Sequence, residues 1–290
     1  MSTTTQPPEE KKMPLLDHLI ELRQRMLWSV GTLLVAFVLC FFFAQQLFDF
    51  LAQPLSDVLL EQKFSEQNRR LIFTNLTEVF FTYVKVAFFA AAFICCPIFL
   101  TQLWLFVAPG LYKHEKTAFA PFLAATPVLF FIGGSLVYYL IFPMVVRFFI
   151  SFETMGGTDS LPIELEQRVA EYFSLMMKLI FAFGLCFQLP VVMTLMARVG
   201  LATSKGMAAK RKYAIVGVFI FAAIFTPPDP ISQLSLAFPI ILLYELSIIM
   251  ARFVEKKRAT DEYDDLDDDF DDDDDETPTD DGGTTTPATT

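Results

Sequence analysis

The residues that could do chemistry in this sequence are few, and most lie within or beside long apolar runs. We find no nucleophile–base set, no HExxH motif, no glycine-rich phosphate loop and no spaced cluster of cysteine and histidine. His18 and His114 border apolar runs, which is typical of solvated interfacial positions. All four cysteines lie inside apolar runs, where a thiol behaves as a small hydrophobe. The sequence therefore predicts neither an enzyme nor a metal or cofactor site.

Two glutamates stand at the edges of apolar runs. Glu21 lies in the segment 14–25, whose apolar residues form one face at helical spacing, and Arg25 follows it at i+4. Glu115 comes after the helix-breaking pair Pro109-Gly110 and just before an apolar run, where a carboxylate favours a helix N-terminus. An ion pair with Arg25 is therefore a sufficient structural explanation of Glu21, and a helix cap is a sufficient structural explanation of Glu115.

Other polar residues interrupt the apolar runs themselves: Lys85, Lys178, Gln188 and Glu245. Each would cost a few kcal/mol at the centre of a lipid-facing helix, so we expect these side chains to face protein or water. Gln188 stands two residues before Pro190 and predicts a polar group at a proline kink. Asp229 lies in a proline-rich turn and could cap the helix that follows.

Composition indicates a membrane protein. Hydrophobic residues make up 54% of the 290 residues, and 33 are phenylalanine, more apolar surface than a soluble domain of this length can cover. The net charge of −11 arises from residues 259–290, which hold 15 acidic residues and no basic ones. Such a tail is self-repelling, so we expect disorder from Asp261 to Asp281, and it argues against nucleic-acid binding.

Apolar runs of sufficient length predict an all-α polytopic membrane protein with six transmembrane helices. The predicted spans cover residues 26–48, 79–101, 118–142, 172–197, 213–226 and 231–252. The last two are short and are separated by the turn at 226–230, which holds three prolines. This organisation divides the chain into a cytoplasmic N-terminal segment (1–25) with an interfacial helix, a transmembrane domain (26–254) and an acidic tail (255–290).

Basic residues predict the orientation. An even number of spans leaves both termini on one side, and 15 Lys and Arg residues fall on that side against five on the other. The positive-inside rule therefore predicts that both termini are cytoplasmic. In the first external connection, 49–77, Leu51, Leu55 and Val58 recur at helical spacing and predict a short amphipathic helix on the outer surface.

Four motifs occur in order on this six-span pattern, and together they carry a family resemblance. They are His18-Leu-Ile-Glu-Leu-Arg23, Pro109-Gly-Leu-Tyr-Lys-His-Glu115, Phe183-Gly-Leu-Cys-Phe-Gln-Leu-Pro190, and Thr226-Pro-Pro-Asp229 with Ser232-Gln233. From about residue 14 to 254 the chain resembles the TatC family of the twin-arginine (Sec-independent) protein translocase. The resemblance implies six tilted helices in a concave, glove-like arrangement, with two short final helices.

The resemblance also implies a function. TatC-like proteins of the bacterial inner membrane recognise twin-arginine signal peptides of folded precursors and drive export with the proton-motive force. They bind single-span TatA- and TatB-like subunits and self-associate in a multimeric receptor complex. Glu21 and Glu115 match the two cytoplasmic glutamates that contact the arginine pair, and a carboxylate accepts the guanidinium fork in a bidentate geometry that lysine cannot reproduce.

Further positions match the family's functional residues. The surrounding recognition surface corresponds to Arg23, Phe106, Leu111, Tyr112 and Lys113. Intramembrane polar or partner contacts correspond to Pro54, Tyr138, Gln188, Asp229 and Gln233. The position of Gln188 is commonly a glutamate in the family. Because glutamine cannot ionise, we interpret Gln188 as a polar contact for a partner helix or water and not as a proton relay.

Two other classes of protein remain alternatives. A small-solute secondary transporter would need a midplane site in broken helices, for which the chain offers Lys85, Lys178 and Gln188 but no internal repeat and no paired carboxylates. An intramembrane hydrolase would need a buried nucleophile with its base, and none can be assembled from the sequence.

Overall fold

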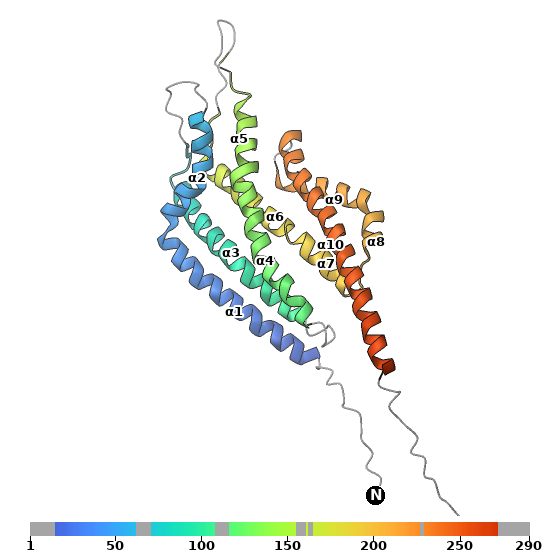
Figure 1. Cartoon of the computed structure of the whole chain (residues 1–290). Helices are drawn as coiled ribbons and strands as arrows, with labels where there is room; N and C mark the ends of the chain where they lie inside the picture. The colour runs from blue at the N-terminus through green and yellow to red at the C-terminus, as the bar shows by residue number, and fades with distance from the viewer. Residues whose placement is uncertain are drawn as a thin grey trace, which may run out of the picture.

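The fold is all-α, as predicted. The computed structural model describes residues 15–61, 71–107, 116–154, 161, 165–226 and 229–271. Its elements are α1 (Leu15–Phe42), α2 (Ala44–Glu61), α3 (Glu78–Val107), α4 (Lys116–Leu136), η3 (Val137–Ile141), α5 (Phe142–Ile150), α6 (Val169–Cys186), α7 (Leu189–Arg198), α8 (Ser204–Ala209), α9 (Arg211–Phe225) and α10 (Pro230–Asp271). Figure 1 shows long tilted helices, with α1 beginning and α10 ending at the same end of the molecule.

Five of the six predicted spans have the length and apolarity needed to cross a bilayer. Within the described ranges these are Leu22–Phe42, Glu78–Leu103, Ala124–Ile150, Val169–Arg198 and Pro230–Lys256. The predicted span 213–226 corresponds to α9, whose 15 residues reach only about 22 Å, less than the ~30 Å hydrocarbon core. The expectation that the last helix is also short is wrong, because α10 has 42 residues and tolerates Pro239 in its interior.

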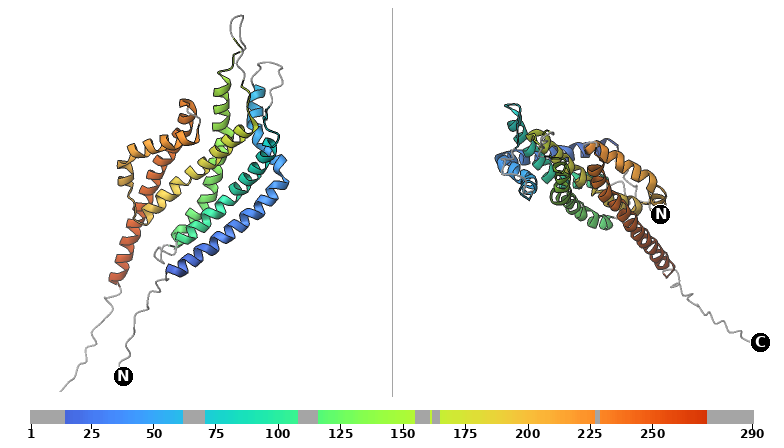
Figure 2. Two further views of the ribbon diagram at one scale, coloured as in Figure 1. Left: turned by 180° about the vertical axis from the view of Figure 1, so that it is seen from behind. Right: turned by 90° about the horizontal axis from the view of Figure 1, so that it is seen from above.

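The core is built around α6 and α7. This span is the most buried of the five, whereas the span in α1 is the least buried. α4 packs on α6, α1 packs along α3, and α10 packs on α7 and α9; Figure 2 shows α1 at one edge of the bundle and α8 and α9 at the other. The largest fully buried side chains include Phe130, Phe142, Phe173, Met176 and Phe183. α1 therefore presents most of its apolar surface outward, as expected of a helix that contacts lipid.

The first span ends earlier than predicted. α1 stops at Phe42, and α2 begins at Ala44 in place of a span continuing to residue 48. The predicted helix in the following connection exists, but it is part of the bundle and not a separate surface helix. Leu51, Leu55 and Val58 are buried in the core, so the change of direction brings the apolar stripe of α2 against the rest of the protein.

The third span is longer than predicted and contains a widened turn. The predicted span ends at residue 142. In the structure the helix passes through the π-helical segment η3 and then continues to Ile150. Pro143 follows this segment, and a proline removes one backbone donor and clashes with the carbonyl one turn earlier. The wider turn, in which the Phe142 N–H donates to the Val137 carbonyl, lets the helix continue past the proline.

Two predicted helix interruptions are confirmed. α6 ends at Cys186 and α7 begins at Leu189, so the helix breaks at Gln188 just before Pro190. In the turn after α9, the Ser232 N–H donates to Asp229 Oδ2 at 2.6 Å. Asp229 therefore caps the N-terminus of α10, as its sequence position suggested.

The predicted domain boundaries do not coincide with helix ends. α1 runs without a break across residues 25 and 26, so the interfacial segment and the first span form one helix. α10 crosses residue 255 and stays helical to Asp271, and the expected disorder is therefore wrong for 261–271. Between Pro239 and Asp271 no proline or glycine interrupts the chain, and an established helix extends more easily than a new one forms.

Glycines allow α4 and α6 to approach closely. A Cβ added at Gly133 would lie 2.8 Å from the Phe183 carbonyl oxygen and 2.9 Å from Phe187 Cδ2. A Cβ added at Gly184 would lie 2.6 Å from Phe130 Cε2. The absence of a side chain at these positions thus sets the distance between the two helices, a common device in membrane bundles.

We predict that Gly133→Ala destabilises the protein by about 1–3 kcal/mol, because the new methyl group meets backbone and cannot be accommodated by rotating a side chain. Gly217→Ala in α9 is the matched control, since a Cβ there meets nothing within 4 Å. It should be neutral or stabilising by up to about 1 kcal/mol. Thermal unfolding of the purified full chain in one detergent measures both, and equal midpoints would contradict the packing argument.

Candidate functional site

Three of the predicted recognition residues are described, and their helix positions lie at the end of the bundle where α1 begins. Glu21 and Arg23 lie on the first turns of α1, and Phe106 lies on the last turn of α3. Arg23 is exposed, while the side chains of Glu21 and Phe106 fall outside the description. The remaining predicted residues, Leu111, Tyr112, Lys113 and Glu115, lie outside the described residues. Figure 1 shows the start of α1, the end of α3 and the start of α4 at this same end.

A hydrogen bond links the two helices that carry this set. Arg25 Nη1 donates to Gln102 Oε1 at 3.1 Å, between the third turn of α1 and the end of α3. Glu21 is one helical turn before Arg25, and Phe106 is one turn after Gln102. The segments 21–25 and 102–106 are therefore neighbours, and 102–106 lies just before the α3–α4 connection in the sequence.

Gln188 is a buried amide with an unused acceptor. Its Nε2 donates to the Thr126 carbonyl oxygen of α4 at 3.0 Å, while its Oε1 is buried without a hydrogen-bond partner among the residues that the structure describes. Gln188 lies at the break between α6 and α7, where the proline prevents a continuous helix. The amide donor is thus used within the chain, by α4, whereas the predicted contact with a partner helix or water stays a prediction.

The turn between α9 and α10 holds Asp229 and Gln233 together. Gln233 Nε2 donates to the Phe219 carbonyl oxygen of α9 at 3.1 Å, and the Gln233 N–H donates to the Asp229 carbonyl at 3.2 Å. Asp229 uses Oδ2 for the cap, and its Oδ1 is buried with no partner in the described part of the chain. In this structure the two residues fix the angle between α9 and α10.

Pro54 and Tyr138 lie together at the end of the bundle opposite to the start of α1. Both are buried, and they line a groove of about 530 Å³ between α2 and the η3–α5 segment. The Tyr138 hydroxyl donates to the Phe50 carbonyl at 2.8 Å, and the two rings are stacked with centroids 4.6 Å apart. The Tyr138 hydroxyl is therefore used within the protein.

Comparisons with known proteins agree with this arrangement. A model of the TatC family, the Sec-independent protein translocase protein, matches residues 17–239. The Sec-independent protein translocase protein TatC of Magnetococcus marinus is 49% identical over 253 residues, which cover 87% of this chain and 89% of that protein. TatC of Rickettsia prowazekii is 40% identical, with 83% and 94% of the two chains covered. A crystal structure of the twin-arginine translocase receptor TatC superposes with a TM-score of 0.69 at 33% identity, covering 82% of this chain and 99% of that one.

The chain belongs to the TatC family. It is a membrane component of the Sec-independent protein translocase and not an enzyme. The family assignment does not support the alternative of a small-solute transporter. The six-helix arrangement predicted for a TatC protein is consistent with the described helices, with α9 as the short fifth helix.

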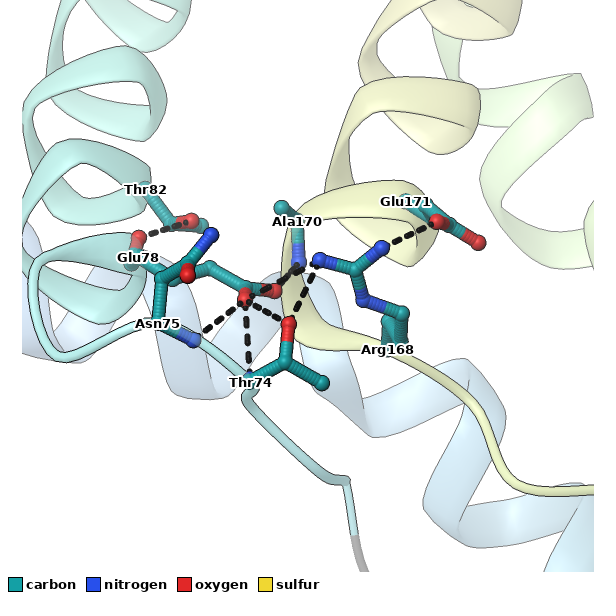
Figure 3. A network of polar contacts seen from close by, with 7 residues as sticks. All are labelled: Thr74, Asn75, Glu78, Thr82, Arg168, Ala170 and Glu171. Carbon is teal, nitrogen blue, oxygen red and sulfur yellow. Dashed lines mark hydrogen bonds and ion pairs between the residues drawn. The ribbon is translucent and has the colours of Figure 1, made fainter.

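The most connected polar residue was not singled out by sequence analysis. Glu78, at the start of α3, is buried, and its Oε2 accepts hydrogen bonds from the backbone N–H of Thr74 at 3.0 Å and of Asn75 at 3.4 Å. Its Oε1 accepts from the Ala170 N–H at the start of α6, and Arg168 Nη2 lies 3.3 Å from Oε2. Figure 3 shows this network joining the first turns of α3 and α6.

Backbone contacts reinforce the same junction. The Ile72 N–H donates to the Gln167 carbonyl at 3.1 Å, and the Val169 N–H donates to the Ile72 carbonyl at 2.9 Å. Arg168 also donates to Thr74 Oγ1 at 2.8 Å. One signal could have identified Glu78, since an acidic residue three positions after Asn75 at a helix start resembles a capping box. Its partners on α6 are about 90 residues away and leave no local pattern.

The charged residues inside the spans have different environments. Glu245 of α10 pairs with Arg211 at the start of α9, with 2.8 Å between Oε2 and Nη2. Lys85 and Lys178 are exposed, and neither forms an ion pair with another described residue. Glu245 and Gln188 therefore contact protein, one of the two environments expected for these side chains, whereas Lys85 and Lys178 are exposed on α3 and α6.

We predict that Glu78→Gln loosens the junction between α3 and α6. The amide keeps the shape of the side chain, but its nitrogen cannot accept from backbone N–H groups, and the attraction to Arg168 is lost. Hydrogen exchange of the full chain should become faster at residues 71–78 and 168–171. Glu171→Gln is the control, because Glu171 is exposed and contacts only Arg168 in the network drawn. Equal exchange in both variants would show that Glu78 does not hold the junction.

Proposed function

We propose that this TatC protein is the receptor for twin-arginine signal peptides, with Glu21 and Glu115 as the acceptors of the arginine pair. The observation that supports this most directly is the hydrogen bond from Arg25 to Gln102, which joins the segment that holds Glu21 to the end of α3, shortly before Glu115 in the sequence. The similar crystal structures are described as twin-arginine translocase receptors, and this supports the same role here.

The chemistry of the two carboxylates suits this ligand. A guanidinium donates two parallel hydrogen bonds to one carboxylate, whereas an ammonium is a point charge without that geometry. Two carboxylates on neighbouring segments can therefore each take one arginine of a pair. Arg23, Phe106, Leu111, Tyr112 and Lys113 would surround them and contact the rest of the signal peptide.

We further propose that both termini are cytoplasmic in a bacterial inner membrane. Fifteen basic residues on the side of the termini against five on the other support this orientation. The common end at which α1 begins and α10 ends is consistent with it. Folded precursors would then meet the recognition residues on the cytoplasmic side, and export would draw on the proton-motive force.

Gln188 is the proposed contact for a single-span TatA- or TatB-like subunit. Its donor is already used by Thr126, so the partner residue must itself donate a hydrogen bond to Oε1. A glutamine, serine or lysine in an otherwise apolar partner helix would satisfy that requirement. Gln233 and Asp229 would act by holding α9 and α10, while contacts at Pro54 and Tyr138, and self-association of the receptor, stay predictions.

We predict that a twin-arginine peptide binds the purified protein on the order of ten- to a hundredfold more tightly than its twin-lysine counterpart. Glu21→Gln and Glu115→Gln should each remove most of that preference, because an amide cannot accept two donors as a carboxylate does. Glu171→Gln, at the opposite end of the bundle, is the control. Fluorescence anisotropy in nanodiscs, with and without partner subunits, measures the ratio. A preference that survives both substitutions would contradict the assignment of the two glutamates.

We predict that Gln188→Met weakens retention of the single-span partner by roughly tenfold, since a buried donor on the partner would lose its acceptor at a cost of about 1–3 kcal/mol. Gln188→Glu should keep the partner, because a carboxylate still accepts. Gln46→Met, at an exposed amide of α2, is the control. Co-purification in mild detergent measures the effect. Normal retention by Gln188→Met would mean that the partner docks elsewhere.

A further inference from the structure

The groove between α2 and the η3–α5 segment is lined by Pro54 and Tyr138, and its charged end has no role in the function proposed above. α2 contributes one face of its helix to it, from Phe50 to Glu61, and the opposite wall runs from Tyr138 to Arg147. The groove is closed at one end by the stacked rings of Phe50 and Tyr138, and at the other by the ion pair between Glu61 and Arg147. From the first contact to the second, the residue number rises on both helices. The two helices therefore run parallel, and the cavity between them is elongated.

The groove changes from apolar to charged along its length. Leu140 and Met144 are exposed on a segment long and apolar enough to cross a membrane, and Arg147 follows one turn later near the end of that segment. From Leu140 to Arg147 the helix rises about 10 Å. The apolar wall is therefore at the depth of lipid chains, and the charged rim is at the depth of lipid headgroups.

The charges on the rim favour a cation. Asp57 lines the groove one turn before Glu61, is exposed, and has no hydrogen bond or ion pair with any other described residue. Glu61 and Arg147 are 2.6 Å apart, and each side chain is more than half exposed. Two carboxylates and one guanidinium leave a net negative charge.

We propose that this groove binds a zwitterionic phospholipid that carries a primary ammonium in its headgroup. The ammonium would be bound by Asp57, and the phosphodiester would accept from the N–H groups of Arg147 that Glu61 leaves unused. The first part of an acyl chain would lie along Leu140 and Met144. A cavity of about 530 Å³ is within the usual range for a bound small molecule.

Two competing occupants fit less well. An anionic phospholipid has the phosphate but no ammonium, and the net negative rim repels it. A free amine of a polypeptide would match Asp57, but it would leave the exposed apolar wall of Leu140 and Met144 without a chain to cover it. A ligand with an ammonium, a phosphate and an apolar chain uses all three parts of the groove.

The test uses the full chain in detergent, with native mass spectrometry to count bound lipid. Phosphatidylethanolamine should bind more tightly than phosphatidylglycerol with the same acyl chains. Asp57→Asn should weaken phosphatidylethanolamine binding about tenfold through loss of one charge-assisted hydrogen bond. Asp57→Lys should reverse the preference. Asp49→Asn, an exposed aspartate of the same helix that does not line the groove, should bind as the unaltered protein does.

Three outcomes would overturn the proposal. The first is equal binding of the two lipids, and the second is an equal effect of Asp57→Asn and Asp49→Asn. The third is displacement of the lipid at equimolar ratio by a short peptide with a free N-terminal amine but not by its acetylated form, which would identify a polypeptide as the occupant. Asp57 is exposed and unpartnered within the described chain, so an unchanged thermal midpoint of Asp57→Asn is expected and confirms that the variant is folded.

Discussion

Hydrocarbon offers no hydrogen-bond partner, and several helix starts and breaks in the described part of this protein are held by side chains of the same chain. The start of α3 is capped by Glu78, the start of α10 by Asp229, and the break before α7 is bridged to α4 by Gln188. The π-helical turn before Pro143 keeps the backbone bonded across a residue that lacks a donor. These few polar contacts act together with helix packing, which itself favours particular crossing angles.

The difference in length between α9 and α10 has a physical consequence at the end where α10 continues. α9 begins at Arg211, which pairs with Glu245, and α10 then extends for a further apolar stretch before Lys256. The basic residues at the start of α9 therefore lie beside an apolar part of α10. Both partners of the ion pair are nearly half exposed, so water or lipid headgroups must reach this level, by local thinning of the bilayer or by a hydrated surface.

A structural feature could be predicted from the sequence where it is determined by residues close to it in the chain. The proline kink at Gln188 and the cap by Asp229 are determined by residues within a few positions, and both were predicted correctly. The placement of α2 was not, because an amphipathic stripe such as Leu51 and Leu55 looks the same whether it faces a membrane surface or a protein core. The network of Glu78 with Arg168 joins residues about 90 positions apart, and a charge that serves a distant partner resembles a solvated one.

The candidate site shows the same difference between features determined by neighbouring residues and contacts between residues far apart in the sequence. Family motifs predict Glu21 and Glu115 as site residues, and helix periodicity predicts the helix that carries Glu21, but neither indicated that Arg25 would reach across to Gln102. The helical continuation of α10 through residues 261–271 was missed because composition describes the average behaviour of an acidic segment. It does not describe a segment that extends a helix already held in a bundle.

α4 is the element that the two proposed sites share. Glu115 immediately precedes it, and Thr126, about 15 Å further along the axis, accepts the amide of Gln188 through its carbonyl. Under the function proposed above, a signal peptide that displaces the start of α4 would act on that hydrogen bond through a helix that contains Pro121. If the bond breaks, the donor of Gln188 is released and the amide can offer both donor and acceptor to a partner helix. Coupling of signal recognition to partner docking then requires no ionisable group at this position, and glutamine suffices where the family commonly has glutamate.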